Sequence, residues 1–422
     1  MSKQLLNTIS RSIISMSVAM IFTQTALAEN TTVDQQFAEG MNLRDAGDYE
    51  ASIAAFQGVL SSEPTLNRAR AELAVSYFRA LNFAAAKEEA EKVLADPNTP
   101  EGVKVNVRKF LETIDNESRK HVFTPYVTFG FGHDNNVNVG PSSSTINLGG
   151  AQLVANATPI SKNYNMLNVG LAHRYLSPTP IHAFGRSAAY IWQSNVSYYR
   201  NDYFGSSDYD LNVLSLSTGP LAVVAERWRA GVDFTYDYIN LGHAKLAEFY
   251  GVTPSATWSV NKTTDVSLNA KYQNRQFNES AAPGRDSNYE SVELNVGKAF
   301  FDSKFTVQVG ANLFNEKADV SRFSNDGYQL SAGANMRIAE SNNVYVKNVY
   351  KSSKFDGVEP LFNVARDENE NRITIGVNHR FSQNIVKDWT VDANVTHTNN
   401  NSNVAIYDYS RTQFGVTMGK FF

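Results

Sequence analysis

Residues 413–422 read Gln-Phe-Gly-Val-Thr-Met-Gly-Lys-Phe-Phe and carry apolar side chains at Phe414, Val416, Met418 and Phe422. Successive side chains of a β-strand point to opposite faces, so this alternation predicts a strand with one apolar face, which Lys420 interrupts. Bacterial outer-membrane barrels commonly end in such a strand, which their assembly machinery reads. We therefore predict that these four apolar residues form a barrel assembly signal. A frayed aromatic tail is the alternative.

The same period of two residues recurs upstream through residues 121–422. Val266, Leu268, Ala270 and Tyr272, for example, alternate with polar residues. The pattern predicts fourteen strands, at about 122–132, 163–176, 187–200, 208–219, 222–241, 244–260, 265–277, 288–300, 304–316, 325–339, 343–355, 369–382, 388–398 and 406–422.

Turn lengths separate a membrane barrel from a soluble sandwich, since both give alternating strands. The predicted turns are alternately short, as at 261–264, and long, as at 278–287 and 356–368. Outer-membrane barrels have short periplasmic turns and longer outer loops, and their strands must close on each other because lipid tolerates no open edge. The sequence therefore predicts a 14-stranded antiparallel transmembrane β-barrel over residues 121–422.

Residues 1–28 have the features of a secretory signal peptide. Lys3 and Arg11 supply positive charge, an apolar stretch follows, and Ala26-Leu27-Ala28 fits a cleavage site. The chain has no cysteine, which excludes disulfides and a lipid-modified cysteine. Its formal net charge of −4 comes without a basic block, which argues against a nucleic-acid partner. These features predict export to the outer membrane of a Gram-negative cell.

Residues 29–120 show helical periodicity and an internal repeat. A shift of 34 residues aligns Tyr49 with Phe83 and Val59 with Val93, a period that resembles the tetratricopeptide repeat. An ordinary helical hairpin is the alternative. An apolar stripe in residues 100–118 predicts a capping helix. We predict an α+β multi-domain chain, in which a periplasmic tetratricopeptide-like helical domain at 29–120 precedes the barrel.

Candidate binding residues lie in both parts of the chain. Repeat domains bind peptides on their concave face, so Asn42, Tyr49 and Tyr77 are the candidate cargo contacts. The polar face of the strands predicts a luminal wall of mixed charge that either hydrates a channel or grips a polypeptide. Its candidate members share a polar side chain on the side of the strand opposite the apolar residues: Lys271, Glu293, Asn295, Arg337, Arg380 and Asp392. The alternative is that these residues only bond to one another inside a closed barrel.

The segment after the first predicted strand contains Asp134-x-Asn136-Val137-Asn138. Asp and Asn favour turns, and the spacing does not fit a known calcium loop. Together with the helical domain and the strand count, this run resembles the Slam family (surface lipoprotein assembly modulators), also described as outer-membrane parts of type XI secretion systems. Members join a periplasmic tetratricopeptide domain to a fourteen-stranded barrel. The family motif here is Asp134, Asn136, Val137 and Asn138.

The resemblance implies protein transport across the outer membrane. In the family, the cargo is a surface lipoprotein or a soluble secreted protein, often one that binds host iron or heme carriers. We therefore expect an exported cargo protein, a periplasmic chaperone, outer-membrane lipid and the barrel assembly machinery as partners. An exopolysaccharide export porin with a periplasmic tetratricopeptide domain and a simple diffusion porin are the alternatives. No motif predicts catalysis, a cofactor or a metal site, so we expect no enzyme.

Overall fold

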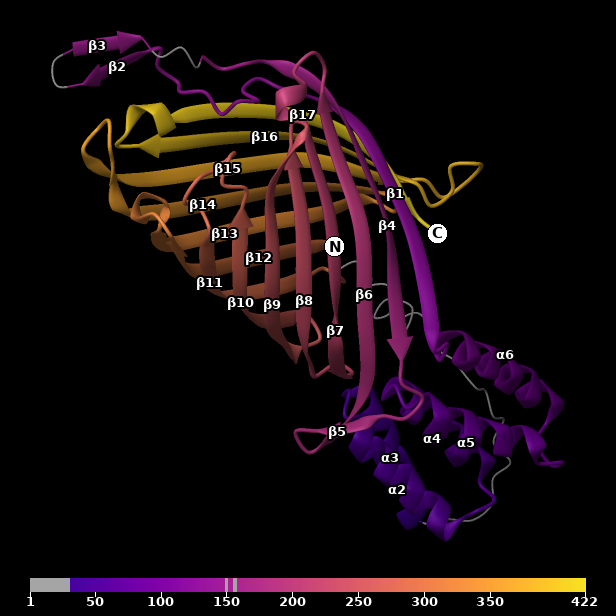
Figure 1. The fold of residues 1–422 in the computed structure, drawn as a ribbon. Helices are drawn as coiled ribbons and strands as arrows, with labels where there is room; N and C mark the ends of the chain where they lie inside the picture. Colours follow the sequence, from indigo (N-terminus) through magenta and orange to yellow (C-terminus); the bar gives the residue numbers. More distant parts are fainter. Residues whose placement is uncertain (1–30, 149–150, 155–157) are drawn as a thin grey trace. The chain divides into compact units, whose positions relative to one another are not determined.

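The computed structural model describes residues 31–422 except 149–150 and 155–157 (Figure 1). The predicted signal peptide at 1–28 lies outside the described residues. Contacts divide the chain into two compact units. The first comprises residues up to Val122 with Tyr175–Ile191 and Ala222–Glu226, and the second comprises Phe123–Arg174, Trp192–Leu221 and Arg227–Phe422.

Five helices form most of the first unit: α2 (Thr31–Asp45), α3 (Tyr49–Ser62), α4 (Asn67–Arg79), α5 (Phe83–Ala95) and α6 (Glu101–Glu117). The side chains of Asp48 and Asn82 cap α3 and α5 by accepting hydrogen bonds from backbone N–H groups. The predicted capping helix corresponds to α6, whose buried residues are Val103, Val107, Phe110 and Ile114. The helical character of this region is confirmed, and its resemblance to tetratricopeptide repeats stays a prediction.

Small residues allow α2 and α3 to approach closely. A Cβ atom at Gly40 would lie 2.9 Å from the ring of Phe56, which is fully buried. Ser52 donates a hydrogen bond to the Gly40 carbonyl at 2.8 Å, and its hydroxyl lies 2.9 Å from that of Ser76 on α4. Apolar packing and satisfied buried hydroxyls therefore hold three successive helices together.

Phe56→Ala should lower the free energy of unfolding of the helical unit by about 3–5 kcal/mol, because it removes a buried ring from the centre of this packing. Val105→Ala is the matched control, since Val105 is 42% exposed on α6. Thermal unfolding of the full chain, followed by the helical circular dichroism signal, measures both variants. Equal midpoints would show that Phe56 does not anchor the helices.

Fourteen antiparallel strands form the barrel. They are β1 (His121–Asp134), β4 (Lys162–Leu176), β6 (Arg186–Tyr203), β7 (Leu211–Val224), β8 (Trp228–Leu241), β9 (Ala244–Asn261), β10 (Thr264–Phe277), β11 (Ser287–Phe300), β12 (Phe305–Ala318), β13 (Asn325–Ala339), β14 (Asn342–Glu359), β15 (Val364–Arg380), β16 (Thr390–Ser402) and β17 (Tyr409–Phe421). The first and last strands, β1 and β17, pair with each other, and β4 pairs with both β1 and β6, which closes the ring.

Shorter strands and helices lie between the fourteen strands along the chain. The hairpin β2 (Thr145–Leu148) and β3 (Ala151–Val154) belongs to the first loop, and β5 (Ile181–Ala183) pairs with the start of β6. Short 3-10 helices, η1 (Ser207–Tyr209), η2 (Ser321–Phe323) and η3 (Ala405–Tyr407), lie in three of the connections. In the part of the chain that the structure describes, no helix is long and apolar enough to span a membrane.

The predicted number and direction of the strands are confirmed, and two connections were placed wrongly. The structure turns between Val224 and Trp228, where Glu226 has a φ of 57°, whereas the prediction placed this break at 220–221. The predicted long loop at 356–368 is largely strand, because β14 continues to Glu359 and β15 begins at Val364. A register shift between Lys354 and Val358 absorbs the irregularity.

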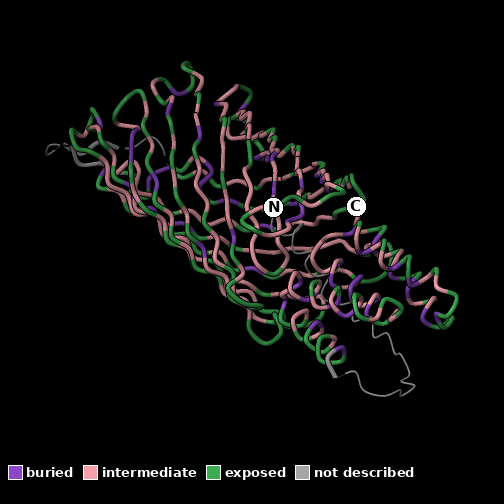
Figure 2. Tube along the Cα trace, turned by 90° about the horizontal axis from the view of Figure 1, so that it is seen from below, coloured by how far each residue is buried: buried purple, intermediate pink, exposed green. Residues whose placement is uncertain are grey.

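The two faces of each strand carry different side chains. Large apolar residues are exposed at every second position of a strand, which places them on one face. Examples are Val292 and Leu294 on β11 and Ile373 and Ile375 on β15. Figure 2 shows that positions along the strands are mostly half-buried or exposed, with buried positions scattered among them. An apolar outer face and a polar inner face are what a closed barrel in lipid requires.

Candidate functional site

Cations and aromatic rings meet on the inner face of the barrel. Arg275 on β10 lies over the Tyr289 ring at 4.1 Å and over the Phe249 ring at 5.4 Å. Lys351 on β14 lies over the Phe314 ring at 4.8 Å. These five residues occupy the strand face opposite the exposed apolar residues, and we call them the luminal belt.

One carboxylate, that of Glu316, balances part of the charge of the luminal belt. Arg275 forms an ion pair with Glu316 on β12 at 2.9 Å, and Ser287 donates a hydrogen bond to the same carboxylate at 2.7 Å. A cation stacked on a ring and bound to an acid is held in one orientation. The wall therefore presents fixed charges of both signs, which suits a hydrated polar substrate better than a bare ion of one sign.

The six polar residues predicted for the lumen do not form one cluster. Glu293 accepts a hydrogen bond from Asn269, and Asp392 accepts one from the Tyr345 hydroxyl at 3.0 Å. Arg337 donates to a turn carbonyl, that of Ser303, and Arg380 pairs with Asp388 in the connection before β16. Lys271 and Asn295 lie on β10 and β11. Neighbouring polar groups thus satisfy several of them.

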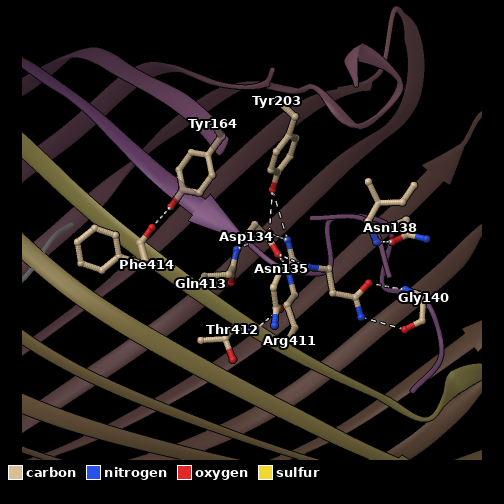
Figure 3. A network of polar contacts seen from close by, with 12 residues as sticks. Asp134, Asn135, Asn138, Gly140, Tyr164, Tyr203, Arg411, Thr412, Gln413 and Phe414 are labelled. Carbon is tan, nitrogen blue, oxygen red and sulfur yellow. Dashed lines mark hydrogen bonds and ion pairs between the residues drawn. The ribbon is translucent and has the colours of Figure 1, made fainter. Parts of the chain in front are cut away.

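The run Asp134-x-Asn136-Val137-Asn138, which resembles the Slam motif, begins with a buried carboxylate where β1 meets β17. Asp134 is completely buried. Arg411 Nε donates hydrogen bonds to it at 3.0 and 3.1 Å, and Arg411 Nη2 also forms an ion pair with it. Gln413 Nε2 and the Tyr203 hydroxyl donate to it as well, at 3.0 and 3.2 Å (Figure 3). These partners bring β1, β17 and β6 together around one charge.

The rest of the motif fixes the first loop. Asn136 donates to the carbonyls of Gly140 and Ser410, at 2.9 and 3.0 Å, and accepts from the Gly140 N–H. Asn138 bridges to the far side of the loop, donating to the Thr158 carbonyl and accepting from the Ile160 N–H at 2.8 Å. Each amide replaces backbone partners that an irregular loop lacks. The motif therefore folds the loop and ties it to β17.

Sequence reasoning did not identify the partners of Asp134. Arg411 is 277 positions away, and Tyr203 lies two strands along the barrel. The register pairs Asp134 with Gln413, and the even residues of β1 share a face with the odd residues of β17. A predicted first-to-last strand pairing with this register would have placed Arg411 and Gln413 beside Asp134.

The candidate cargo contacts of the helical unit differ in exposure. Asn42 is exposed and Tyr77 is half-buried, with its hydroxyl accepting a hydrogen bond from Gln57 at 2.8 Å. Tyr49 is buried, and its hydroxyl donates to Glu226 at 2.6 Å. Burial and this carboxylate raise the pKa of Tyr49. Asn42 and Tyr77 are the two members that a partner can reach.

The four residues of the predicted assembly signal lie on or beside β17. Phe414, Val416 and Phe422 are among the exposed apolar residues, and Met418 is half-buried. The backbone N–H of Phe422 donates to the Pro125 carbonyl at 2.9 Å, beyond the last paired residues of β1 and β17. Their outward exposure is compatible with a surface that another protein reads, and that role stays a prediction.

Comparisons with known proteins give one family and several barrels. The family described as "Protein of unknown function (DUF2860)" matches residues 254–419, less than half of the chain. No curated protein matches. Because the matched family has no described function, it does not bear on the resemblance to the Slam family.

The structural matches are distant. They include OmpTdeltaL8, a loop L8 deletion mutant of the Vibrio cholerae outer membrane protein OmpT (10% identity, TM-score 0.39, covering 72% of this chain and 100% of that one). An anion-selective porin from Comamonas acidovorans matches with 10% identity, TM-score 0.41 and coverage of 72% and 99%. A Pseudomonas aeruginosa FadL homologue matches with 11% identity, TM-score 0.36 and coverage of 71% and 90%. Similarity at this level assigns no substrate.

The closed ring of strands, its apolar outer face and its polar inner face define the class of protein. A barrel whose backbone groups are all paired within the ring is the only β-structure that crosses a lipid bilayer. Over its described residues, the chain is a fourteen-stranded barrel of the outer-membrane type, preceded by five helices.

Proposed function

We propose that this protein is an outer-membrane translocon that exports a partner protein, with its helical unit in the periplasm. The luminal belt carries the proposal, because fixed charges of both signs beside aromatic rings suit the mixed side chains of a polypeptide. The Slam-like motif supports it. The helical unit offers cargo or its chaperone a docking surface around Asn42 and Tyr77. No catalytic step belongs to this proposal, and the driving force comes from outside the chain, for example from cargo folding after export.

Polysaccharide export is the second candidate, because Phe249, Tyr289 and Phe314 place aromatic rings on the luminal wall. Sugar faces stack on such rings. In this wall, however, Arg275 or Lys351 lies over each of the three rings and competes with a sugar for that face. The rings therefore favour a polypeptide with charged groups over a neutral sugar chain.

Deletion of the gene tests the proposal. We expect the surface or medium level of at least one protein encoded nearby to fall at least tenfold, and the intact chain to restore it. Surface shaving followed by mass spectrometry measures these levels, and staining of the surface polysaccharide measures the second candidate. Unchanged export of every neighbouring product would contradict protein export, and loss of polysaccharide alone would favour the alternative.

A double variant, Asn42→Ala with Tyr77→Ala, tests the role of the helical unit. We expect it to restore less than a tenth of the export that the intact chain restores, because both side chains lie on the predicted binding surface. Lys109→Ala is the matched control, since Lys109 is exposed on α6. Equal rescue by the double variant and the control would remove these two residues from cargo binding.

A further inference from the structure

A second set of cations and rings lies where β14 and β15 meet the loop before β17. The Arg366 guanidinium lies between two aromatic rings, 3.7 Å from the centre of Phe355 and 4.0 Å from that of Tyr407. Arg366 shares its strand face with Glu368 and Glu370, opposite the exposed apolar residues of β15, so it points into the barrel. Tyr407 belongs to η3, so this stack joins a connecting loop to the luminal wall.

Two carboxylates complete the cluster. Arg366 lies 3.4 Å from Glu368 and 4.0 Å from Glu359. We name Phe355, Glu359, Arg366, Glu368 and Tyr407 the Arg366 latch. The Arg366 side chain is only 12% exposed and that of Glu359 only 8%, so these charges are largely removed from water.

The latch is held by stacking while its polar atoms remain incompletely bonded. Among the described residues, Arg366 Nε and Glu359 Oε1 are buried without a hydrogen-bond partner, and they are the two atoms 4.0 Å apart. Burying unsatisfied polar atoms disfavours this arrangement, and the two ring contacts favour it. A two-state element needs contributions that oppose each other in this way.

Backbone bonds connect the neighbouring loops into the same assembly. The loop before β13 bonds to β14, where the Asp356 N–H donates to the Ser324 carbonyl at 3.0 Å. The loop before β17 bonds to β15 through Asn403, whose side chain donates to the Ala365 carbonyl at 2.8 Å and accepts from the Asp367 N–H. Another cation, Arg285, lies over the rings of Phe277 and Phe323. Movement of the latch would therefore move several loops together.

We propose that the Arg366 latch is a gate, which holds the loop before β17 inward at this end of the barrel and opens when Arg366 leaves its two rings. The inference rests on the proposed transport function and adds its regulation. At rest the channel is closed, and a substrate arriving in the lumen opens it by competing for Arg366 or for the rings.

Single-channel recording in planar bilayers tests the gate without any cargo. We expect the intact protein to be closed for most of the time and Arg366→Ala to raise the open probability at least tenfold. Arg366→Lys should give an intermediate value, since lysine keeps the charge and loses the planar stack. Arg372→Ala is the matched control, because Arg372 lies on the same face of β15, pairs with Glu370 at 2.8 Å and is 51% exposed.

The outcomes separate the gate from the function. An unchanged open probability in a folded Arg366→Ala barrel, or an equal rise in Arg372→Ala, would overturn the gate and leave protein export standing. If Arg366→Ala fails to show the gel shift of a folded barrel, the open probability of Phe355→Leu tests the gate instead. This variant removes one ring of the latch and keeps an apolar side chain. A closed Phe355→Leu channel would then overturn the gate. An opening variant in a chain whose deletion affects no export would support the gate and contradict the translocon.

Discussion

Asp134→Asn should lower the free energy of unfolding of the barrel by about 3 kcal/mol, because it leaves the Arg411 guanidinium without its counter-charge in a largely buried site. Asp134 is completely buried, and the Arg411 side chain is 22% exposed. The asparagine amide would also place two N–H donors among the donors of Arg411, Gln413 and Tyr203. Urea unfolding of the refolded barrel, followed by β-type circular dichroism, measures the change.

Asp388→Asn is the control for Asp134→Asn. Asp388 pairs with Arg380 at 2.8 Å, but its side chain is 43% exposed and that of Arg380 is 66% exposed. Exposed pairs contribute about 0–1 kcal/mol, and asparagine tolerates the positive φ of this position. Because Asp134 also accepts the Asn136 N–H at 3.0 Å, displacement of residue 134 from Arg411 in the variant should loosen the first loop and expose it to protease. Equal unfolding midpoints and equal cleavage in the two variants would mean that the Asp134 pair does not hold β1 to β17.

The number and direction of the strands could be predicted from the sequence because one physical rule governs them. A barrel in lipid needs an apolar and a polar face on every strand, so the period of two residues marks strands even when each one is weakly apolar. The rule does not locate a turn whose position depends on backbone conformation. Gly219-Pro220 has the composition of a turn, whereas the chain turns at Glu226, a residue whose side chain gives no sign of the left-handed backbone it adopts.

The luminal site was less predictable than the strands. The alternation assigns polar residues to the inner face, but Phe249, Tyr289 and Phe314 lie there too, each beneath a cation from another strand. Such pairs depend on register between strands, and a shift of one residue would turn every ring to the outside. The motif at Asp134 was recognised as a turn signal, but its role in joining the first and last strands required the closure of the ring.

Gly132→Ala should destabilise the barrel by about 3 kcal/mol or more and reduce the yield of folded protein, because a methyl group has no room where β1 pairs with β17. Gly132 lies opposite Gly415, and the Tyr164 ring of β4 lies against this glycine pair. A Cβ at 132 would overlap both the Tyr164 ring and the Phe414 carbonyl. The ring can rotate away, but the carbonyl belongs to the backbone of β17. Overpacking against fixed atoms costs about 1–3 kcal/mol, and displacement of β17 would also weaken the pairing that closes the ring.

Gly297→Ala is the control for Gly132→Ala. Gly297 is also a strand glycine, on β11, but a Cβ atom there would meet no atom within 4 Å. We expect this control to fold with the yield of the original chain and to unfold at an equal or slightly higher urea concentration, because alanine restricts the unfolded chain. A second variant, Gly132→Ala with Tyr164→Ala, removes the ring and should recover only part of the loss, since the Phe414 carbonyl remains. Full recovery would assign the whole effect to Tyr164. If Gly132→Ala folds as well as Gly297→Ala, β1 and β17 can pair without the close approach that Gly132 permits.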